Sequence, residues 1–403
     1  MEFGPIWRAS MRNKTGVLLV VLQVAFTLAL IVNAVAIAER QAEVMVRPSG
    51  IDEDNIFHVR SSAFVQSFNA RNSIEEDLRL LRGTPGVADA IQINSVPISG
   101  SGMGMGLKTT PDAAIEGVGA AVYMVDERGL DALGVTLMAG QGFGPTDVDW
   151  SDTSTSRWPA RTILSKPLAE TLFPDDPGLG LGEVVYIEDT QPMTVAGIVE
   201  RLAAPWPGWE GAERSILVPR RQVGAESLYL VRAEPGRRDA LMPEIEAKLA
   251  ARESGRILQD MLTMEETRDR TFEVGGALVN ILTFTVVVLV TITSFGVAGL
   301  TSFNVTRRIK QIGTRRALGA SRAAILRYFL AENLLFSVLG VVLGAALAVG
   351  INLWLVEAFS VPRFSWLWLP LTMLALVAIS QLAVLFPARR ASQVPPAVAT
   401  RTV

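Results

Sequence analysis

Four apolar runs dominate the hydrophobic pattern of this 403-residue chain. They cover Gly16–Ala38, Val274–Thr306, Asn333–Val356 and Phe364–Ala388, and none of them contains a charged residue. A bilayer core of about 30 Å is crossed by about 20 helical residues. A soluble core helix of this length would carry a polar face, which these runs lack. The pattern therefore predicts four transmembrane helices.

Between the first and second runs, the pattern changes to short alternating stretches and short amphipathic segments. Val184–Val199 contains two alternating stretches around Asp-Thr-Gln-Pro, which is typical of a β-hairpin. Ser73-Ile-Glu-Glu76 has the form of a capping box and predicts a helix start. Leu241, Ile245 and Leu249 recur every four residues and predict a buried helix face. The segment is expected to be a mixed α+β domain.

A second capping box, Thr263-Met-Glu-Glu266, precedes the second apolar run. No proline separates it from the end of that run. One continuous helix is therefore expected to lead from the mixed domain into the membrane.

Charge segregates along the chain, although the net charge is only −3. Three basic residues lie before the first apolar run, seven lie between the second and third, and three follow the fourth. The segment between the first two runs is acidic, with a net charge of −14 from Glu39 to Glu273. Because Lys and Arg concentrate in cytoplasmic loops, both termini are predicted to be cytoplasmic and the large domain to be outside.

The first run also resembles a signal peptide, because Ala36-Ile-Ala38 has the small residues of a cleavage site. Its length of 23 residues exceeds the signal core of about 7 to 15, which favours a retained anchor. The chain has no cysteine, so the outer domain is expected to fold without disulfides.

The segment Arg308-Ile-Lys-Gln-Ile-Gly-Thr-Arg-Arg-Ala-Leu-Gly-Ala320 resembles the loop between the second and third membrane helices of MacB/FtsX-type ABC transporter permeases. Leu130–Phe143 and Ile163–Phe173 are similar to segments of the periplasmic domain in the MacB-like subgroup, and they occur in the same order. The resemblance covers almost the whole chain. It implies a mixed α+β "porter" part interrupted by a strand-rich "sabre" insertion.

The resemblance implies a permease subunit that works by mechanotransmission. A cytoplasmic ABC ATPase dimer would bind ATP and Mg²⁺, while this chain would bind no cofactor or metal and would catalyse nothing. Expected partners are that ATPase, a second permease subunit and the lipid bilayer. Efflux of a periplasmic substrate would also need an adaptor and an outer-membrane channel. No nucleic-acid partner is expected. Release of lipoproteins from the inner membrane and non-transporting regulation remain alternatives.

The same loop is the expected site of contact with the ATPase. A short helix ending at Gly319 would offer apolar side chains and arginines to the partner. A basic loop that only anchors to lipid headgroups is the alternative. The candidate coupling residues are Arg308, Ile309, Gln311, Ile312, Gly313, Arg315, Arg316, Leu318 and Gly319.

Gln311 departs from the resemblance, because the family usually has Glu there. This favours a heterodimer with a second, non-identical permease, although a homodimer stays open. Gly340, Gly344 and Ala348 are spaced by four in the third run and predict close helix packing, either within the subunit or at a dimer seam.

Other candidate sites are rejected on spacing. Gly100–Thr109 is rich in glycine, but Leu107 separates the last Gly from Lys108, so the Walker A order fails and a flexible loop is expected. Asp147, Asp149 and Asp152 lack the Gly and Glu of a calcium loop. His58 is the only histidine and is expected to be structural or on the surface. Pro205-Trp-Pro-Gly-Trp209 either presents two rings to a partner or lipid, or is a tucked loop.

The predicted organisation is a multi-pass protein of the bacterial inner membrane. Its parts are a cytoplasmic N-terminal segment 1–15, helix 16–38, a periplasmic domain 39–272, helix 273–306, a cytoplasmic coupling loop 307–327, helix 328–356, a short periplasmic loop 357–363, helix 364–388 and a cytoplasmic tail 389–403.

Overall fold

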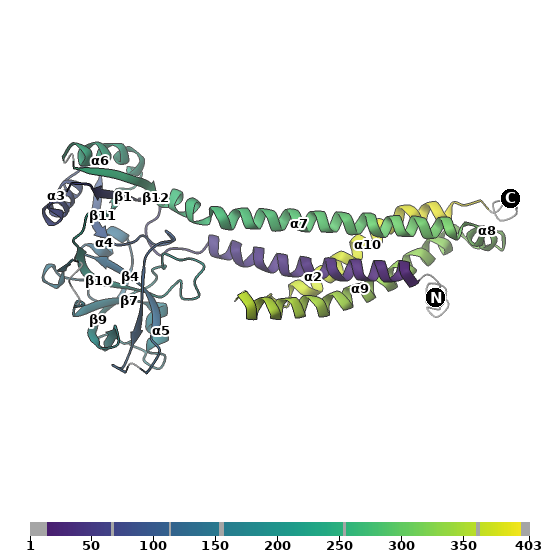
Figure 1. The fold of residues 1–403 in the computed structure, drawn as a ribbon, viewed down its shortest axis with the longest axis horizontal. Coiled ribbons are helices and arrows are strands. Elements are labelled where there is room, and N and C mark those ends of the chain that lie inside the picture. Colours follow the sequence, from purple (N-terminus) through teal and green to yellow (C-terminus); the bar gives the residue numbers. More distant parts are fainter. Residues whose placement is uncertain are drawn as a thin grey trace. The chain divides into compact units, whose positions relative to one another are not determined.

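The computed structural model describes residues 14–65, 68–112, 114–152, 157–252, 255–359 and 363–395 (Figure 1). The chain divides into two compact units. The outer unit is Val44–Glu273, and the membrane unit combines the segments before and after it. The expected cytoplasmic segment 1–15 and tail 389–403 lie partly outside the described residues.

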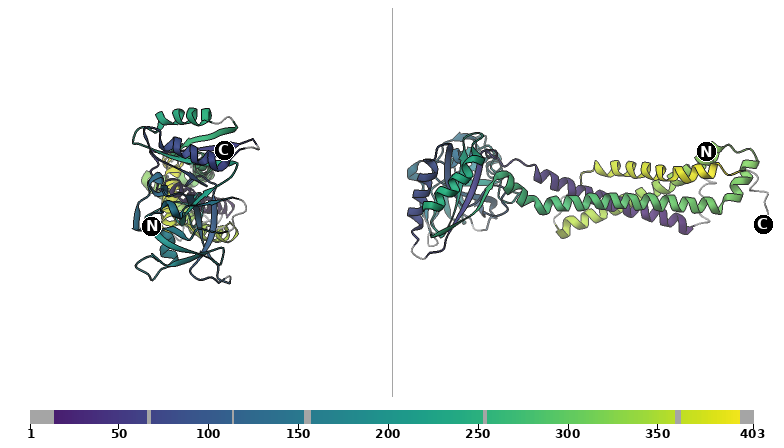
Figure 2. Two further views of the ribbon diagram at one scale, coloured as in Figure 1. Left: turned by 90° about the vertical axis from the view of Figure 1, so that its left-hand side faces the viewer. Right: turned by 90° about the horizontal axis from the view of Figure 1, so that it is seen from above.

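Within the described residues of the membrane unit, four helices are long and apolar enough to cross a membrane, which confirms the predicted number. α9 and α10 pack side by side (Figure 2). A short helix, α8, lies between α7 and α9 in the chain. The bounds are α2 (Lys14–Met45), α7 (Met264–Arg307), α8 (Ile309–Ala317), α9 (Arg322–Phe359) and α10 (Trp368–Ser392).

The last helix begins later than the apolar run that predicts it. The run starts at Phe364, whereas α10 starts at Trp368. Pro370 has no N–H and is best tolerated in the first turn of a helix, where N–H groups have no intrahelical partner. The helix therefore starts shortly before this proline.

A four-stranded antiparallel sheet forms one part of the outer unit, in the order β12-β1-β11-β2. α6 packs against three of its strands, and α3 packs against β2 (Figure 1). Leu241, Ile245 and Leu249 are the buried residues of α6, as their spacing predicts. The bounds are β1 (Ile56–Ala63), α3 (Ala70–Arg82), β2 (Val87–Ile93), β11 (Glu226–Ala233), α6 (Arg238–Arg252) and β12 (Arg256–Thr263).

Residues between β2 and β11 form a second, mixed sheet, so this strand-rich part is inserted into the first. Its order β4-β3-β8-β9-β7-β10 closes into a ring, because β10 also pairs with β4. The inserted strands confirm the two-part α+β expectation. The bounds are β3 (Met103–Lys108), β4 (Val118–Val125), α4 (Gly129–Leu133), β5 (Leu137–Gly140), η2 (Pro145–Asp147), β6 (Asp149–Ser151), β7 (Arg161–Ser165), α5 (Lys166–Leu172), β8 (Val184–Ile187), β9 (Gln191–Val199) and β10 (Ser215–Gln222).

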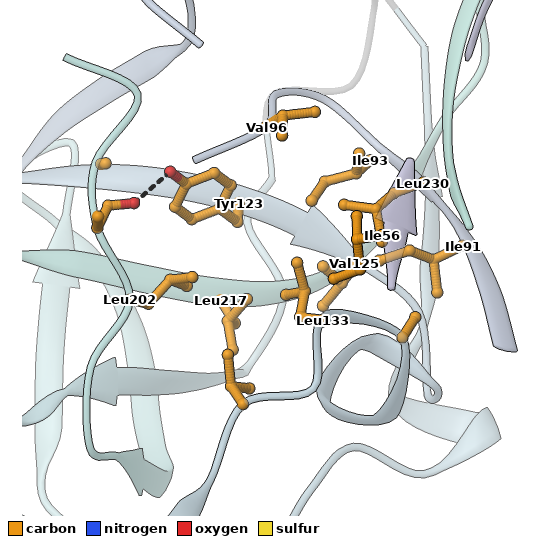
Figure 3. Close-up of a cluster of buried hydrophobic side chains, with 14 of the residues drawn as sticks. Ile56, Ile91, Ile93, Val96, Tyr123, Val125, Leu133, Leu202, Leu217 and Leu230 are labelled. Carbon is orange, nitrogen blue, oxygen red and sulfur yellow. Dashed lines mark hydrogen bonds between the residues drawn. The ribbon is translucent and has the colours of Figure 1, made fainter. Parts of the chain in front are cut away.

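The two sheets share a hydrophobic core (Figure 3). Ile56 and Leu230 from the smaller sheet meet Val125 from the larger one and Leu133 from α4, and all four belong to one buried cluster. Tyr123 is fully buried, and its hydroxyl donates to the carbonyl of Ala203 at 2.6 Å. Because one core joins both parts, the outer unit folds as a single body.

Two local predictions are confirmed and one is wrong. β8 and β9 form the expected hairpin. Thr263 and Glu266 form a reciprocal capping box, with bonds of 3.1 and 2.8 Å, at the start of α7. Ser73 does not cap a helix, because α3 starts at Ala70 and the side chain of Asn69 caps it. Ser73 lies inside α3, where Arg252 donates to its hydroxyl at 2.6 Å.

Candidate functional site

α8 is a basic helix with a well-defined end. Leu318 is its C-cap residue, one position before the predicted end at Gly319. The N–H of Gly319 donates to the carbonyl of Arg316 at 3.1 Å, and the N–H of Ala320 donates to the carbonyl of Arg315 at 3.0 Å. This is a Schellman motif, which requires a left-handed residue after the cap, and Gly319 has φ +94°. The glycine therefore fixes where the helix stops and how Leu318 is presented.

One face of α8 is committed to contacts within the membrane unit. Ile312 is 4% exposed and Gly313 is buried. Arg308 pairs with Glu332 of α9 at 3.0 Å. Ile312, which the sequence offers as an apolar contact for a partner, is instead packed inside the chain.

Arginines near the end of α8 hold it against the neighbouring helices. The guanidinium of Arg315 lies 5.0 Å from the centre of the Tyr328 ring on α9. Arg316 donates to the carbonyl of Ser392 at 2.5 Å, at the end of α10. These contacts favour a fixed helix over a loose basic loop, because each one restrains a long side chain.

The opposite face of α8 is open. Gln311, Thr314 and Leu318 are all exposed and lie on one face, because their spacings of three and four residues match the helical repeat. Leu318 is 84% exposed, more than any other large hydrophobic residue among those described. We call these three residues the α8 stripe. Ile309 is 36% exposed but lies nine residues from Leu318, on another side of the helix.

The crevice between α8 and α9 is too small for a ligand. It holds about 20 Å³ and is lined by Arg308, Gln311 and Tyr328 among others. A volume measured in this way needs about 10 to 15 Å³ to hold one water molecule, so the crevice has room for little more than one water. The arrangement around α8 therefore suits contact with a protein surface better than binding of a small molecule.

Gly340 and Gly344 lie against α2 of the same chain. A Cβ on Gly344 would lie 2.7 Å from the carbonyl oxygen of Ala25, and one on Gly340 would lie 2.8 Å from the Cβ of Val24. Ala348 is fully buried, and its carbonyl accepts a bond of 3.2 Å from Asn33 of α2. Of the two possibilities left by the sequence, the structure places this small-residue face within the subunit.

The glycine-rich segment of the outer unit is a strand, so the expected flexible loop is wrong. Met103–Lys108 forms β3, and Lys108 is 7% exposed. Its ammonium pairs with Asp189 at 2.5 Å, at the turn of the β8–β9 hairpin. The strand pairing and this ion pair explain why the glycines are ordered here.

The acidic residues near β6 form no metal site. Asp147 pairs with Arg161 at 2.7 Å. Among the described residues, no group of three or more His, Cys, Asp or Glu side chains is arranged to hold a metal ion.

His58 is buried between β1 and α7. Thr267 donates to the carbonyl of Thr263, so its hydroxyl oxygen accepts from Nε2 of His58 at 2.8 Å. Burial, with a further contribution from Arg60, lowers the pKa of His58 to about 4. The side chain is therefore neutral at physiological pH and has a structural role.

The two tryptophans of the Pro205–Trp209 loop are half-buried. Their rings meet edge to face, with centroids 6.2 Å apart. They pack against the core and line a shallow apolar groove of about 370 Å³, floored by Gly104 and Gly119. The two rings are thus neither fully buried in the outer unit nor fully exposed to a partner or lipid.

Two buried polar residues of the membrane unit are not indicated by the motifs of the sequence. Glu332 is 5% exposed and is the partner of Arg308. A lone acid beside an apolar run, opposite a basic loop, is a signal that could have identified it. Asn33 is buried and links α2 to α9, accepting from Asn352 at 3.2 Å.

Two family models match the chain. The MacB-like periplasmic core domain matches residues 16–248, and the FtsX-like permease C-terminal domain matches residues 283–396. Together they cover both units.

Curated relatives agree with these matches. The chain is 25% identical over 412 residues to the macrolide export ATP-binding/permease protein MacB of Chromobacterium violaceum, covering 95% of this chain and 58% of that protein. It is 26% identical over 383 residues to macrolide export ATP-binding/permease protein MacB 1/2 of Paracoccus denitrificans, covering 92% and 53%. The chain thus spans less than two thirds of the length of these relatives.

Among solved structures, the periplasmic region of MacB from Actinobacillus actinomycetemcomitans is similar at 14% identity and a TM-score of 0.34. The match covers 57% of this chain and 98% of that one.

Proposed function

Since the chain belongs to the MacB/FtsX-type ABC transporter permeases, we propose that it converts ATP hydrolysis by a cytoplasmic ATPase dimer into movement of the outer unit. This movement drives efflux of a periplasmic substrate without a path through the bilayer. The match to both family models carries the proposal. The first relatives are named as macrolide exporters, which supports efflux as the direction of transport.

ATP and Mg²⁺ are bound by the partner in this proposal. The 403 residues contain no Walker A sequence, in which Lys follows the last Gly of a phosphate loop directly. This chain then acts as a non-catalytic subunit.

The α8 stripe is the proposed docking surface for the ATPase. Leu318 is 84% exposed in the free chain, so its burial by a partner would stabilise the complex. The contacts of Arg308, Arg315 and Arg316 within the chain keep α8 in place, so force applied at Leu318 would be passed to α9 and α10.

α7 is the proposed transmission element. It is a single helix of 44 residues, capped at Thr263 and without proline. A hydrogen-bonded helix transmits displacement along its axis better than an irregular linker. Residues from both units belong to it.

The proposed assembly contains a second permease, a periplasmic adaptor and an outer-membrane channel. Gln311 lies on the α8 stripe, where it would offer a partner a neutral hydrogen bond in place of the charge-assisted bond that Glu would give. We therefore favour a heterodimer. Two differently tagged copies of this chain, coexpressed with the ATPase and a candidate second permease, decide this. Recovery of both tags in one ATPase complex would end the heterodimer idea.

Efflux is tested in a strain that lacks this chain. Cells with wild-type chain should accumulate less labelled macrolide than cells without it, and a Leu318→Asp chain should not restore export. Lipoproteins retained in the inner membrane, with unchanged macrolide accumulation, would favour lipoprotein release. An intact ATPase complex with no effect on either would favour a regulator.

A further inference from the structure

Arg268 is the centre of a cluster at the point where α2 ends and α7 begins. Its guanidinium donates to the carbonyls of Met45 and Arg47, at 2.8 and 3.2 Å. It also pairs with Glu53 at 2.7 Å. All four residues lie in the outer unit. One side chain of α7 therefore binds the end of α2 and the segment that follows it.

The chemistry of this contact suits a helix end. Met45 is the last residue of α2, and carbonyls in the last turn have no intrahelical donor. A guanidinium supplies several donors in one plane, and its positive charge favours the negative end of the helix dipole. Arg268 thus satisfies groups that would otherwise depend on water.

Glu53 is itself fixed in place. Burial opposes its ionisation, but hydrogen bonds from Arg268 and Ser49 outweigh that effect and lower the pKa of Glu53. The Ser49 hydroxyl donates to Glu53 at 2.5 Å, and the Ser49 carbonyl accepts from Ala203 at 2.7 Å. The ion pair is therefore charged at neutral pH and is connected to the body of the outer unit.

The two helices join the outer unit differently. α7 begins at Met264, directly after β12 ends at Thr263. α2 ends at Met45, and ten residues without helix or strand separate it from β1 at Ile56. Ser49 and Asp52 of this linker bond to the body of the outer unit, so residues 46–48 are the part that would absorb a displacement of α2 without a tie.

We propose that Arg268 is a positioning residue that ties α2 to α7, so that both helices move the outer unit together. This inference rests on the proposed function. It adds that force reaches the outer unit through α2 as well as α7. The carbonyl contacts carry the tie, and the ion pair with Glu53 orients the guanidinium.

Three substitutions and a control test this in the full-length chain, copurified with its ATPase. Arg268→Ala removes every contact, Glu53→Gln removes only the charge pair, and Arg268→Lys keeps the charge with fewer donors. Arg270→Ala is the control, because Arg270 is on the same helix but is 62% exposed and pairs with an exposed Asp260. A surface pair of this kind contributes little to stability.

Hydrogen exchange and outer-unit movement are the two readouts. For Arg268→Ala, amides of residues 44–55 should exchange about tenfold faster or more, since a hydrogen-bonded charge has been lost. ATP-dependent movement of the outer unit should fall in the same variant, while ATP hydrolysis continues. Arg268→Lys should recover part of both, Glu53→Gln should have a smaller effect, and Arg270→Ala should match wild type.

The outcomes separate the inference from the proposed function. If wild type shows no ATP-dependent movement, the proposed function fails. If wild type moves and Arg268→Ala moves equally, with unchanged exchange at residues 44–55, the tie is refuted. If Arg268→Ala prevents insertion of the chain into the membrane, Arg268→Lys is the deciding variant. Wild-type movement of the outer unit, together with wild-type hydrogen exchange at residues 44–55, would then refute the tie.

Discussion

Replacing Leu318 with Asp should weaken ATPase binding without harming the permease itself. Leu318 is 84% exposed in the chain alone, so almost all of its side-chain area is available to a partner. Burial of a Leu side chain contributes about 2 kcal/mol. Because 1.4 kcal/mol is a factor of ten, Leu318→Ala should weaken binding about 30-fold.

The Asp variant should be worse than the Ala variant. Burying an unpaired carboxylate adds about 2 kcal/mol or more to the lost apolar contact. The total of about 4 kcal/mol corresponds to a loss of several hundredfold in affinity. In the free chain, the same change at an exposed position should alter stability by about 0.5 kcal/mol or less.

Binding is measured by titrating labelled ATPase into detergent-purified permease. Val46→Asp is the matched control, because Val46 is 79% exposed but lies in the outer unit. Wild-type affinity for Leu318→Asp, measured with a folded and active ATPase, would show that the α8 stripe is not the docking surface.

Three further predictions concern packing, pH and topology. Gly344→Val should destabilise the chain by about 1 to 3 kcal/mol, because the larger side chain would push α9 away from α2. Gly350→Val is the control, because a Cβ at Gly350 would have no atom within 4 Å. Equal melting temperatures for the two variants would refute the contact between α9 and α2. The pKa of His58 in the folded chain is about 4, below its usual value near 6.5. Its contribution to the free energy of unfolding is therefore complete above pH 6.5 and is lost as the pH falls toward 4. Wild type should therefore lose roughly 3 kcal/mol more than His58→Gln over that range in thermal unfolding, and parallel pH profiles would contradict the assignment. In intact spheroplasts, an impermeant thiol reagent should label Thr171→Cys but not Thr314→Cys, both of which are exposed positions; the reverse pattern would invert the topology.

Features set by local sequence were predictable. Apolar runs without charges predict the membrane helices because the bilayer leaves few alternatives. The Thr263 capping box and the β8–β9 hairpin depend on residues within a few positions of each other. The order of the motifs indicated an outer α+β domain between the first two spans.

Choices decided by distant residues were not predictable. Ile312 and Leu318 are both apolar residues of one basic segment, but Ile312 belongs to a buried cluster with residues of other helices, such as Ile325 of α9, whereas Leu318 is exposed. Ser73 and Asn69 both suit a helix cap, and a contact from Arg252 favours keeping Ser73 inside α3. Arg268 forms hydrogen bonds with residues more than 200 positions away in the sequence, so no local pattern predicts its contacts.

Movement of the outer unit on ATP binding is measured most directly by electron paramagnetic resonance on the intact ATPase complex. The native chain has no cysteine, so Thr171→Cys gives a single spin-label site in the outer unit. The second label belongs on the outer domain of the other permease subunit. The account predicts that the distance distribution between the labels shifts when ATP is trapped and returns after hydrolysis. An unchanged distribution in a complex that hydrolyses ATP normally would contradict it.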